Sequence, residues 1–218
     1  MAWCLGRYKE GLMKKILAGV LILIFIVGGI SFLRSRQANQ TLVTQPLSQN
    51  TSNGIPLVIV QDLDIPWEVA FLPSGEMLVT ERPGNLVQIS KDKSEIVVQG
   101  VKHVGEGGLL GMALHPKFSE NNFIYLYSTT QSGGTYFNRV ERYKLQGEQL
   151  LERKVILSGI KGSANHDGGR IIFGPDGMLY IGTGDAENPI SAQDTNSLNG
   201  KILRVELYNS ARTFFERN

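Results

Sequence analysis

A turn that recurs along the chain constrains the fold more than any other feature of the sequence. The segment Phe71–Gly75 reads Phe-Leu-Pro-Ser-Gly, and Phe173–Gly177 reads Phe-Gly-Pro-Asp-Gly; each leads into an apolar or β-branched run. Proline fixes φ and glycine accepts positive φ, so such segments form tight turns between antiparallel strands. A looser copy lies at Leu114–Phe118. The sequence therefore predicts repeated hairpins.

The spacing of these hairpins predicts how the sheets are arranged. The three prolines are 43 and then 59 residues apart, which is the spacing of β-propeller blades, where each small sheet buries both faces by stacking on its neighbours. Beyond residue 56 no run of 12 or more residues shows a 3.6-residue apolar period, so we predict an all-β fold. A β-sandwich is the alternative. The expected strands include Leu57–Val60, Met77–Thr80, Leu86–Ile89, Ile124–Ser128, Ile171–Phe173, Leu179–Ile181 and Ile202–Val205.

An uncharged segment, residues 16–33, precedes the hairpins. A helix of these 18 residues spans roughly 27 Å at about 1.5 Å per residue, enough to cross a bilayer. Residues 1–15 are basic, which predicts a cytoplasmic N-terminus and a single-pass membrane anchor, with the rest of the chain periplasmic or extracellular. A cleaved signal peptide and a buried soluble helix are the alternatives.

Charge and composition separate the remaining regions. Residues 34–56 are polar and are expected to form a spacer between the anchor and the β-domain. The net charge of +2 comes from the N-terminal region, because the chain from residue 37 onward carries 16 basic and 19 acidic residues. Nucleic acid is therefore not an expected partner. The single cysteine, Cys4, precedes the anchor, so the exported part is expected to fold without disulfides.

The loop Gly162–Arg170 is the strongest candidate for a functional site. It places Asn165, His166 and Asp167 between glycines, directly before an expected strand. A neutral imidazole with a pKa near 6.5 can accept a proton, and the adjacent Asp167 carboxylate could fix its tautomer. An exposed histidine that is structural or idle is the alternative.

Metal sites and the other histidines are less informative. His103, His115 and His166 match no zinc pattern. The oxygen-rich stretches Asp185–Asn188 and Gln193–Asp194 could bind a hard cation, but turn formation explains them equally well. No metal ligand is therefore assigned. The glycine-rich turn Gly105–Gly108 is interpreted as a connector, with a close approach of backbone to a flat ligand as the alternative.

Five short motifs occur in order between residues 57 and 205, and together they are more specific than any single hairpin. They are Pro66–Pro73 with Thr80–Gly84, Gly105–Gly111 with Ala113–Pro116, Asn165–Arg170, Tyr180–Asp185, and Ala192–Asp194 with Gly200–Arg204. In this order they resemble the glucose/sorbosone dehydrogenases, also called soluble aldose sugar dehydrogenases, which depend on pyrroloquinoline quinone (PQQ).

The resemblance implies a fold, a reaction and a set of site residues. The family fold is a six-bladed β-propeller that binds PQQ in a cleft, with Ca²⁺ polarising the quinone. By resemblance, His166 is the catalytic base that removes the proton of the C1 hydroxyl of an aldose while hydride passes to PQQ. Glu106 and Asn165 are then expected to bind the cofactor, and Glu106 and Asp167 the sugar. Electrons would pass to an external acceptor.

The sequence departs from the family pattern at two site residues and in its length. Glu106 occupies a position that is Gln in some members, and Asn165 one that is often Asp. Family members are also much longer, and their calcium ligands and several basic cofactor-binding residues lie in later blades. We therefore expect residues 57–205 to be the N-terminal half, about three blades, followed by an unmatched tail, 206–218, in a truncated and inactive chain. The alternative is a non-catalytic extracytoplasmic propeller that binds glycans or protein partners.

Overall fold

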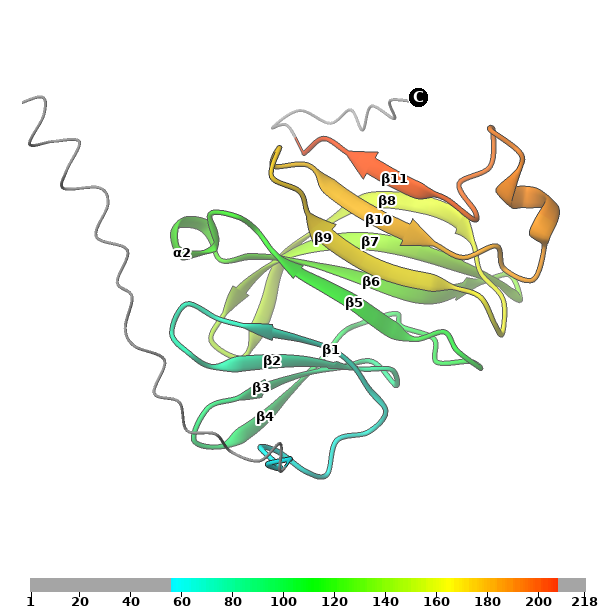
Figure 1. Ribbon diagram of the computed structural model, residues 1–218. Helices are drawn as coiled ribbons and strands as arrows, with labels where there is room; N and C mark the ends of the chain where they lie inside the picture. Colours follow the sequence, from blue (N-terminus) through cyan, green and yellow to red (C-terminus); the bar gives the residue numbers. More distant parts are fainter. Residues whose placement is uncertain (1–55, 208–218) are drawn as a thin grey trace, which may run out of the picture. The chain divides into compact units, whose positions relative to one another are not determined.

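The computed structural model describes residues 56–207 (Figure 1). The predicted anchor at 16–33, the spacer up to residue 55 and the tail from residue 208 lie outside the described residues. From Val58 onward the described chain belongs to one compact unit. Within residues 56–207, no helix is both long and apolar enough to cross a membrane.

Three antiparallel sheets follow one another along the chain, and strands that are neighbours in sequence are neighbours in each sheet (Figure 1). A short helix and a 3₁₀ helix lie in connections. The first sheet contains β1 (Pro66–Phe71), β2 (Met77–Glu81), β3 (Asn85–Ile89) and β4 (Lys93–Val97). The second contains β5 (Leu109–Leu114), β6 (Phe123–Ser132), β7 (Thr135–Gln146) and β8 (Gln149–Lys161), with α2 (Phe118–Asn121) before β6. The third contains β9 (Gly168–Phe173), β10 (Leu179–Thr183) and β11 (Ile202–Val205), with η1 (Pro189–Ala192) before β11.

The first strands of the three sheets lie side by side. β5 contacts both β1 and β9, yet it forms no ladder with either (Figure 1). The first strands of adjacent sheets are therefore joined by side-chain packing rather than by a continuous backbone ladder. Consecutive meanders with adjoining first strands are the arrangement of propeller blades. The predicted β-strand fold is confirmed for residues 56–207.

The repeated Pro-Gly turns have the predicted geometry. The N–H of Gly75 donates to the carbonyl of Leu72 at 2.8 Å, and the N–H of Gly177 donates to the carbonyl of Gly174 at 3.0 Å. Both glycines have positive φ, 92° and 76°. One turn joins β1 to β2 and the other joins β9 to β10, so both close a hairpin at the same end of a first strand.

Two local predictions were wrong. Leu57–Val60 forms no strand, and Leu57, Val58 and Ile59 are 66–80% exposed. Apolar and β-branched residues favour a strand only where a partner ladder and a packed face exist, and this run has neither. The third, looser copy of the turn is not a tight hairpin, because the helix α2 occupies the connection between β5 and β6.

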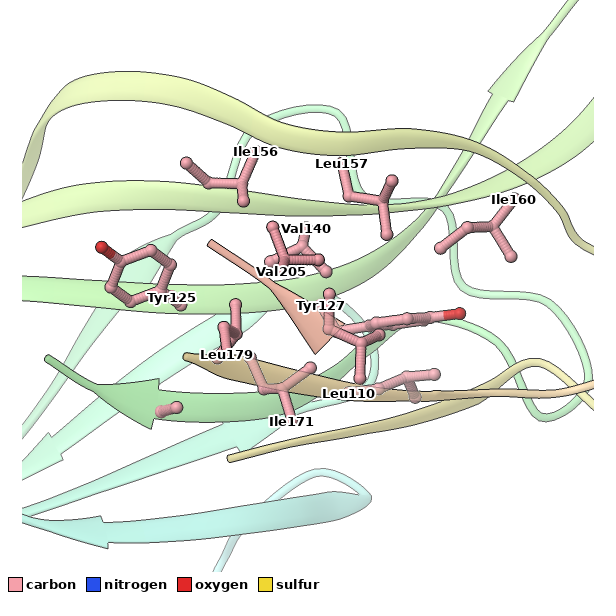
Figure 2. Packing of buried hydrophobic residues seen from close by; sticks show 12 residues of the cluster. Leu110, Tyr125, Tyr127, Val140, Ile156, Leu157, Ile160, Ile171, Leu179 and Val205 are labelled. Atoms are coloured by element: carbon pink, nitrogen blue, oxygen red, sulfur yellow. The ribbon is translucent and has the colours of Figure 1, made fainter. Parts of the chain in front are cut away.

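Alternating side chains of the middle sheet build two cores. On β5, Leu109 packs in one cluster with β2 and β3, whereas Leu110 packs in the other with β9 and β10. On β6, Leu126 and Tyr127 divide in the same way, as the two-residue period of a strand requires. Figure 2 shows the second cluster, in which Tyr127 is fully buried. The middle sheet is thus buried on both faces and provides a rigid frame for the loops at its ends.

Candidate functional site

Three loops from different strands meet at one end of the sheets. Glu106 precedes β5, His166 precedes β9, and Asp185 follows β10. Because β9 and β10 are antiparallel, the start of β9 and the end of β10 lie at the same end of the sheet. His166 is held from both sides: its backbone N–H donates to Glu106 Oε2 at 2.8 Å, and its Nδ1 lies 3.0 Å from Asp185 Oδ1.

The His166 side chain is presented to solvent. Its side chain is 60% exposed, and its backbone has a φ of 60°, in the left-handed region that non-glycine residues rarely adopt. Since Nδ1 contacts Asp185, Nε2 is the ring nitrogen available to a ligand. The hydrogen bond to Asp185, and then the charge of that carboxylate, raise the pKa of the imidazole above its usual value. The negative charges of Glu106 and Glu187 act in the same direction.

The glycine-rich turn at Glu106 packs against protein backbone. The N–H of Glu106 donates to the carbonyl of Ala164 at 2.6 Å, and the Arg82 guanidinium donates to the carbonyl of Gly105. A Cβ on Gly105 would lie 2.0 Å from the Ala164 oxygen. The glycine is therefore required by the close approach of the two loops, which agrees with the interpretation of this turn as a connector.

Asn165 belongs to a second group of polar contacts at the same rim. Its Nδ2 donates to Glu187 Oε1 at 3.0 Å, and the Ser163 hydroxyl donates to Glu187 Oε2. These two hydrogen bonds lower the pKa of Glu187 below its usual value. The predicted cofactor residues Glu106 and Asn165 thus both adjoin His166, since Glu106 accepts its backbone N–H and Asn165 precedes it in the chain. Each is engaged with a neighbouring loop.

Asp167 differs from the sequence-based prediction. It is 2% exposed, and its Oδ1 accepts hydrogen bonds from Asn138 Nδ2 at 2.7 Å and from the Ser163 N–H at 3.1 Å. The left-handed backbone at His166 turns the next side chain into the interior. Asp185, and not Asp167, therefore orients the imidazole. A buried carboxylate also gives no support to the predicted sugar contact.

Sequence reasoning missed the partnership of His166 with Asp185 and the place of Glu187. The signal was Gly184, whose Cβ would lie 1.7 Å from the carbonyl oxygen of His166. A Gly-Asp pair directly after β10 marks a loop that passes close to the start of β9. The two side chains are 19 residues apart in the sequence, and the pairing of β9 with β10 brings them together.

The other candidate residues serve packing and turns. His115 stacks on Tyr125 at 6.2 Å and contacts the edge of Phe173, and burial lowers the pKa of its imidazole. Asp194 Oδ1 accepts the N–H of Asn196 at 2.8 Å, as in a turn. Within residues 56–207, no three His, Cys, Asp or Glu side chains are gathered so that they could hold a metal ion.

Comparisons with known proteins bear on this site. The family model described as Glucose / Sorbosone dehydrogenase matches residues 63–213. The aldose sugar dehydrogenase of Escherichia coli is 33% identical over 158 residues, covering 67% of this chain and 43% of the relative. A putative oxidoreductase (glucose dehydrogenase) of Thermus thermophilus superposes with a TM-score of 0.64 at 46% identity, over 67% of this chain and 44% of that one. The PQQ-bound aldose sugar dehydrogenase of Streptomyces coelicolor gives a TM-score of 0.64 at 39% identity, over 69% of this chain and 47% of that one.

The fold and the site define a propeller-type β-protein with a histidine–carboxylate pair at the rim of its third sheet. The chain belongs to the glucose/sorbosone dehydrogenase family, which confirms the resemblance seen in the motifs. It spans less than half of the length of the relatives described above.

Proposed function

We propose that this chain supplies the proton-accepting part of a quinoprotein active site that oxidises the C1 hydroxyl of an aldose. The observation that carries the proposal is the exposed His166, whose Nδ1 is fixed 3.0 Å from Asp185 while its side chain stays 60% exposed. An oriented, solvent-facing imidazole beside a carboxylate is the arrangement of a general base. Membership of the family supports the reaction class.

The chain's own residues account for the proton. Asp185 holds Nδ1 as the protonated nitrogen, so Nε2 can accept the proton of the sugar hydroxyl. The imidazolium that results is stabilised by the neighbouring carboxylates of Asp185, Glu106 and Glu187, the groups that raise the pKa of His166. The base acts only when neutral, so the rate should increase as the pH rises through that pKa. PQQ, when bound, would accept the hydride from C1.

The polar groups beside His166 fit a cofactor edge. The Glu106 carboxylate is exposed, and Asn165, in the loop that carries His166, is half-buried. We propose both as contacts to PQQ, with Ca²⁺ as the accompanying ion and an external acceptor for the electrons. We also propose that residues 16–33 tether the site outside the cytoplasmic membrane.

We propose that the site needs protein beyond these 218 residues to be complete. A groove of about 400 Å³ runs between β1, β5 and β9, and it is lined mainly by apolar side chains. Val69, Phe71 and Ile172 are 50–65% exposed along these strands. An exposed apolar surface of this kind marks a contact site for protein, membrane or ligand, and we propose that further protein covers it. The isolated chain should therefore show little turnover.

A chimera tests the base independently of turnover by the isolated chain. Residues 57–205 replace the corresponding part of the Escherichia coli aldose sugar dehydrogenase, and dye reduction is measured with PQQ, Ca²⁺ and an aldose. We expect activity that falls at least about 100-fold in His166→Gln, while the 218-residue chain alone stays near background. Equal activity of the chimera and its His166→Gln variant would refute the base. Strong turnover by the chain alone would refute only the need for further blades.

A non-catalytic module that binds glycans or proteins is the second candidate, and the exposed apolar groove favours it. This candidate predicts no PQQ binding by the chimera and unchanged partner binding after His166→Gln. Fluorescence titration with PQQ separates the two functions, because only the first predicts saturable binding.

A further inference from the structure

The His166 loop has to be held by something other than its own side chain. The imidazole is mostly exposed, and its backbone occupies a strained left-handed conformation with a φ of 60°. Such conformations cost free energy, and they persist only where the surroundings fix them. The contacts that fix the loop therefore decide whether the imidazole reaches Asp185.

The residue after His166 makes the deepest contacts of the loop. The carbonyl oxygen of Asp167 accepts a hydrogen bond from the Tyr127 hydroxyl at 2.8 Å, and its Oδ1 accepts one from Asn138 Nδ2 at 2.7 Å. Tyr127 and Asn138 are both fully buried, on β6 and β7, and Figure 2 shows Tyr127 within the apolar cluster. Asn138 is itself fixed, because its Oδ1 accepts the Thr129 hydroxyl at 2.7 Å.

The second oxygen of Asp167 faces the other loop of the site. Oδ2 is buried and forms no hydrogen bond within the described residues. A Cβ on Gly107 would lie 2.9 Å from it and 2.8 Å from Thr129 Oγ1. An unpaired buried carboxylate oxygen costs stability, whereas Oδ1 and the main-chain carbonyl of Asp167 are both hydrogen-bonded. The carboxylate lies between the loop that carries His166 and the turn that carries Glu106.

We propose that Asp167, held by Asn138 and Tyr127, is a positioning residue that fixes His166 against Asp185. The inference rests on the proposed function for its catalytic meaning, but its geometry concerns this chain alone. Asp167 reaches neither solvent nor the imidazole, and it acts through the backbone of the loop. The strands of the second sheet thereby set the orientation of a side chain that belongs to the third.

The test follows the titration of the His166 imidazole by NMR in the full 218-residue chain without cofactor. His166→Gln identifies the resonance among the three histidines. Because the contact with Asp185 raises the pKa of His166, loss of positioning should move the titration down toward that of a free imidazole. We expect this movement in Asp167→Ala and in Tyr127→Phe, whereas Asp167→Asn should titrate like the wild type because its Oδ1 still accepts from Asn138.

A matched control excludes general destabilisation. Glu141 is also a buried carboxylate of the second sheet, but its partners are Arg139, Tyr143 and Arg153. Glu141→Gln should leave the His166 titration unchanged. If Asp167→Ala does not fold, Tyr127→Phe carries the test, since it removes one hydroxyl and keeps the ring. Wild-type titration in a folded Asp167→Ala or in Tyr127→Phe would overturn the proposal.

Kinetics in the chimera add a second readout. Loss of positioning should lower kcat by about 10- to 100-fold with little change in KM, since misplacement of a base affects the transition state more than binding. An equal change in both parameters would contradict positioning. Failure of the proposed function would leave the unmodified chimera inactive, whereas the NMR titration would still report whether Asp167 positions His166.

Discussion

Glu141 and Asp167 are buried carboxylates on the same framework, but they are surrounded in opposite ways. Glu141 accepts hydrogen bonds from Tyr143 and Arg153 and forms an ion pair with Arg139. Within residues 56–207, Asp167 forms no ion pair, and one of its oxygens is unpaired. A carboxylate that serves only the fold is saturated with donors, whereas one that serves a site can be left incomplete.

Removal of the saturated carboxylate should have the largest effect on stability. Glu141→Ala leaves Arg139, whose side chain is only 16% exposed, without its partner. We expect a loss of about 3–5 kcal/mol in the free energy of unfolding, measured by urea denaturation. Glu95→Ala, which breaks an exposed ion pair with Lys93, should cost less than about 1 kcal/mol. Similar losses in the two variants would show that Glu141 is not a structural anchor.

A methyl group added between the His166 loop and the Glu106 turn should have the next largest effect on stability. Gly107→Ala brings a Cβ to 2.9 Å from Asp167 Oδ2, which is closer than a normal contact. We expect a loss of about 1–3 kcal/mol from overpacking. Gly182→Ala is the control, because its Cβ would lie 3.7 Å from the nearest atom. If Gly107→Ala is as stable as Gly182→Ala, the space beside Asp167 is open.

The ionisation of Asp167 should make the stability of the protein depend on pH. Burial raises the pKa of Asp167 above its value of 3.8 in the unfolded chain. The folded state therefore holds this proton more tightly, and the associated stability is present below pH 3.8 and is lost as the pH rises through the folded pKa. Asp167→Asn should consequently gain stability over wild type as the pH rises above 3.8. Parallel curves for the two proteins in urea denaturation would contradict this.

The smallest expected effect is a change in the pKa of His166 with the fold unchanged. Asp185→Asn removes the charge that raises the pKa of His166, so the imidazole should titrate at lower pH. Glu187→Gln should lower it less, since its charge contributes less. Both side chains lie on a surface loop, so the melting temperature should change by only a few degrees. An NMR titration that ranks the two variants in the reverse order would be evidence against the His166–Asp185 contact.

Local signals allowed the turns and the His166 loop to be predicted, because proline, glycine and their spacing act within a few residues. The pairing of His166 with Asp185 depends on the antiparallel ladder between β9 and β10, which no local pattern records. Asp167, adjacent in the sequence, is the expected carboxylate partner of the His166 imidazole. The positive φ at His166, however, reverses the direction of the next side chain. The lengths of β7 and β8 also escaped prediction, since three register shifts interrupt their pairing.

The Pro-Gly turns have a practical consequence for anyone who wishes to modify this protein. They close the hairpins at the end of β1 and β9 opposite to His166, about 20 Å away along a six-residue strand. In the described part of the chain, nothing lies within 4 Å of a Cβ built on Gly75 or Gly177. A fluorophore, an affinity tag or a surface linker attached there would face solvent, and the opposite rim, which carries His166, would be left unobstructed.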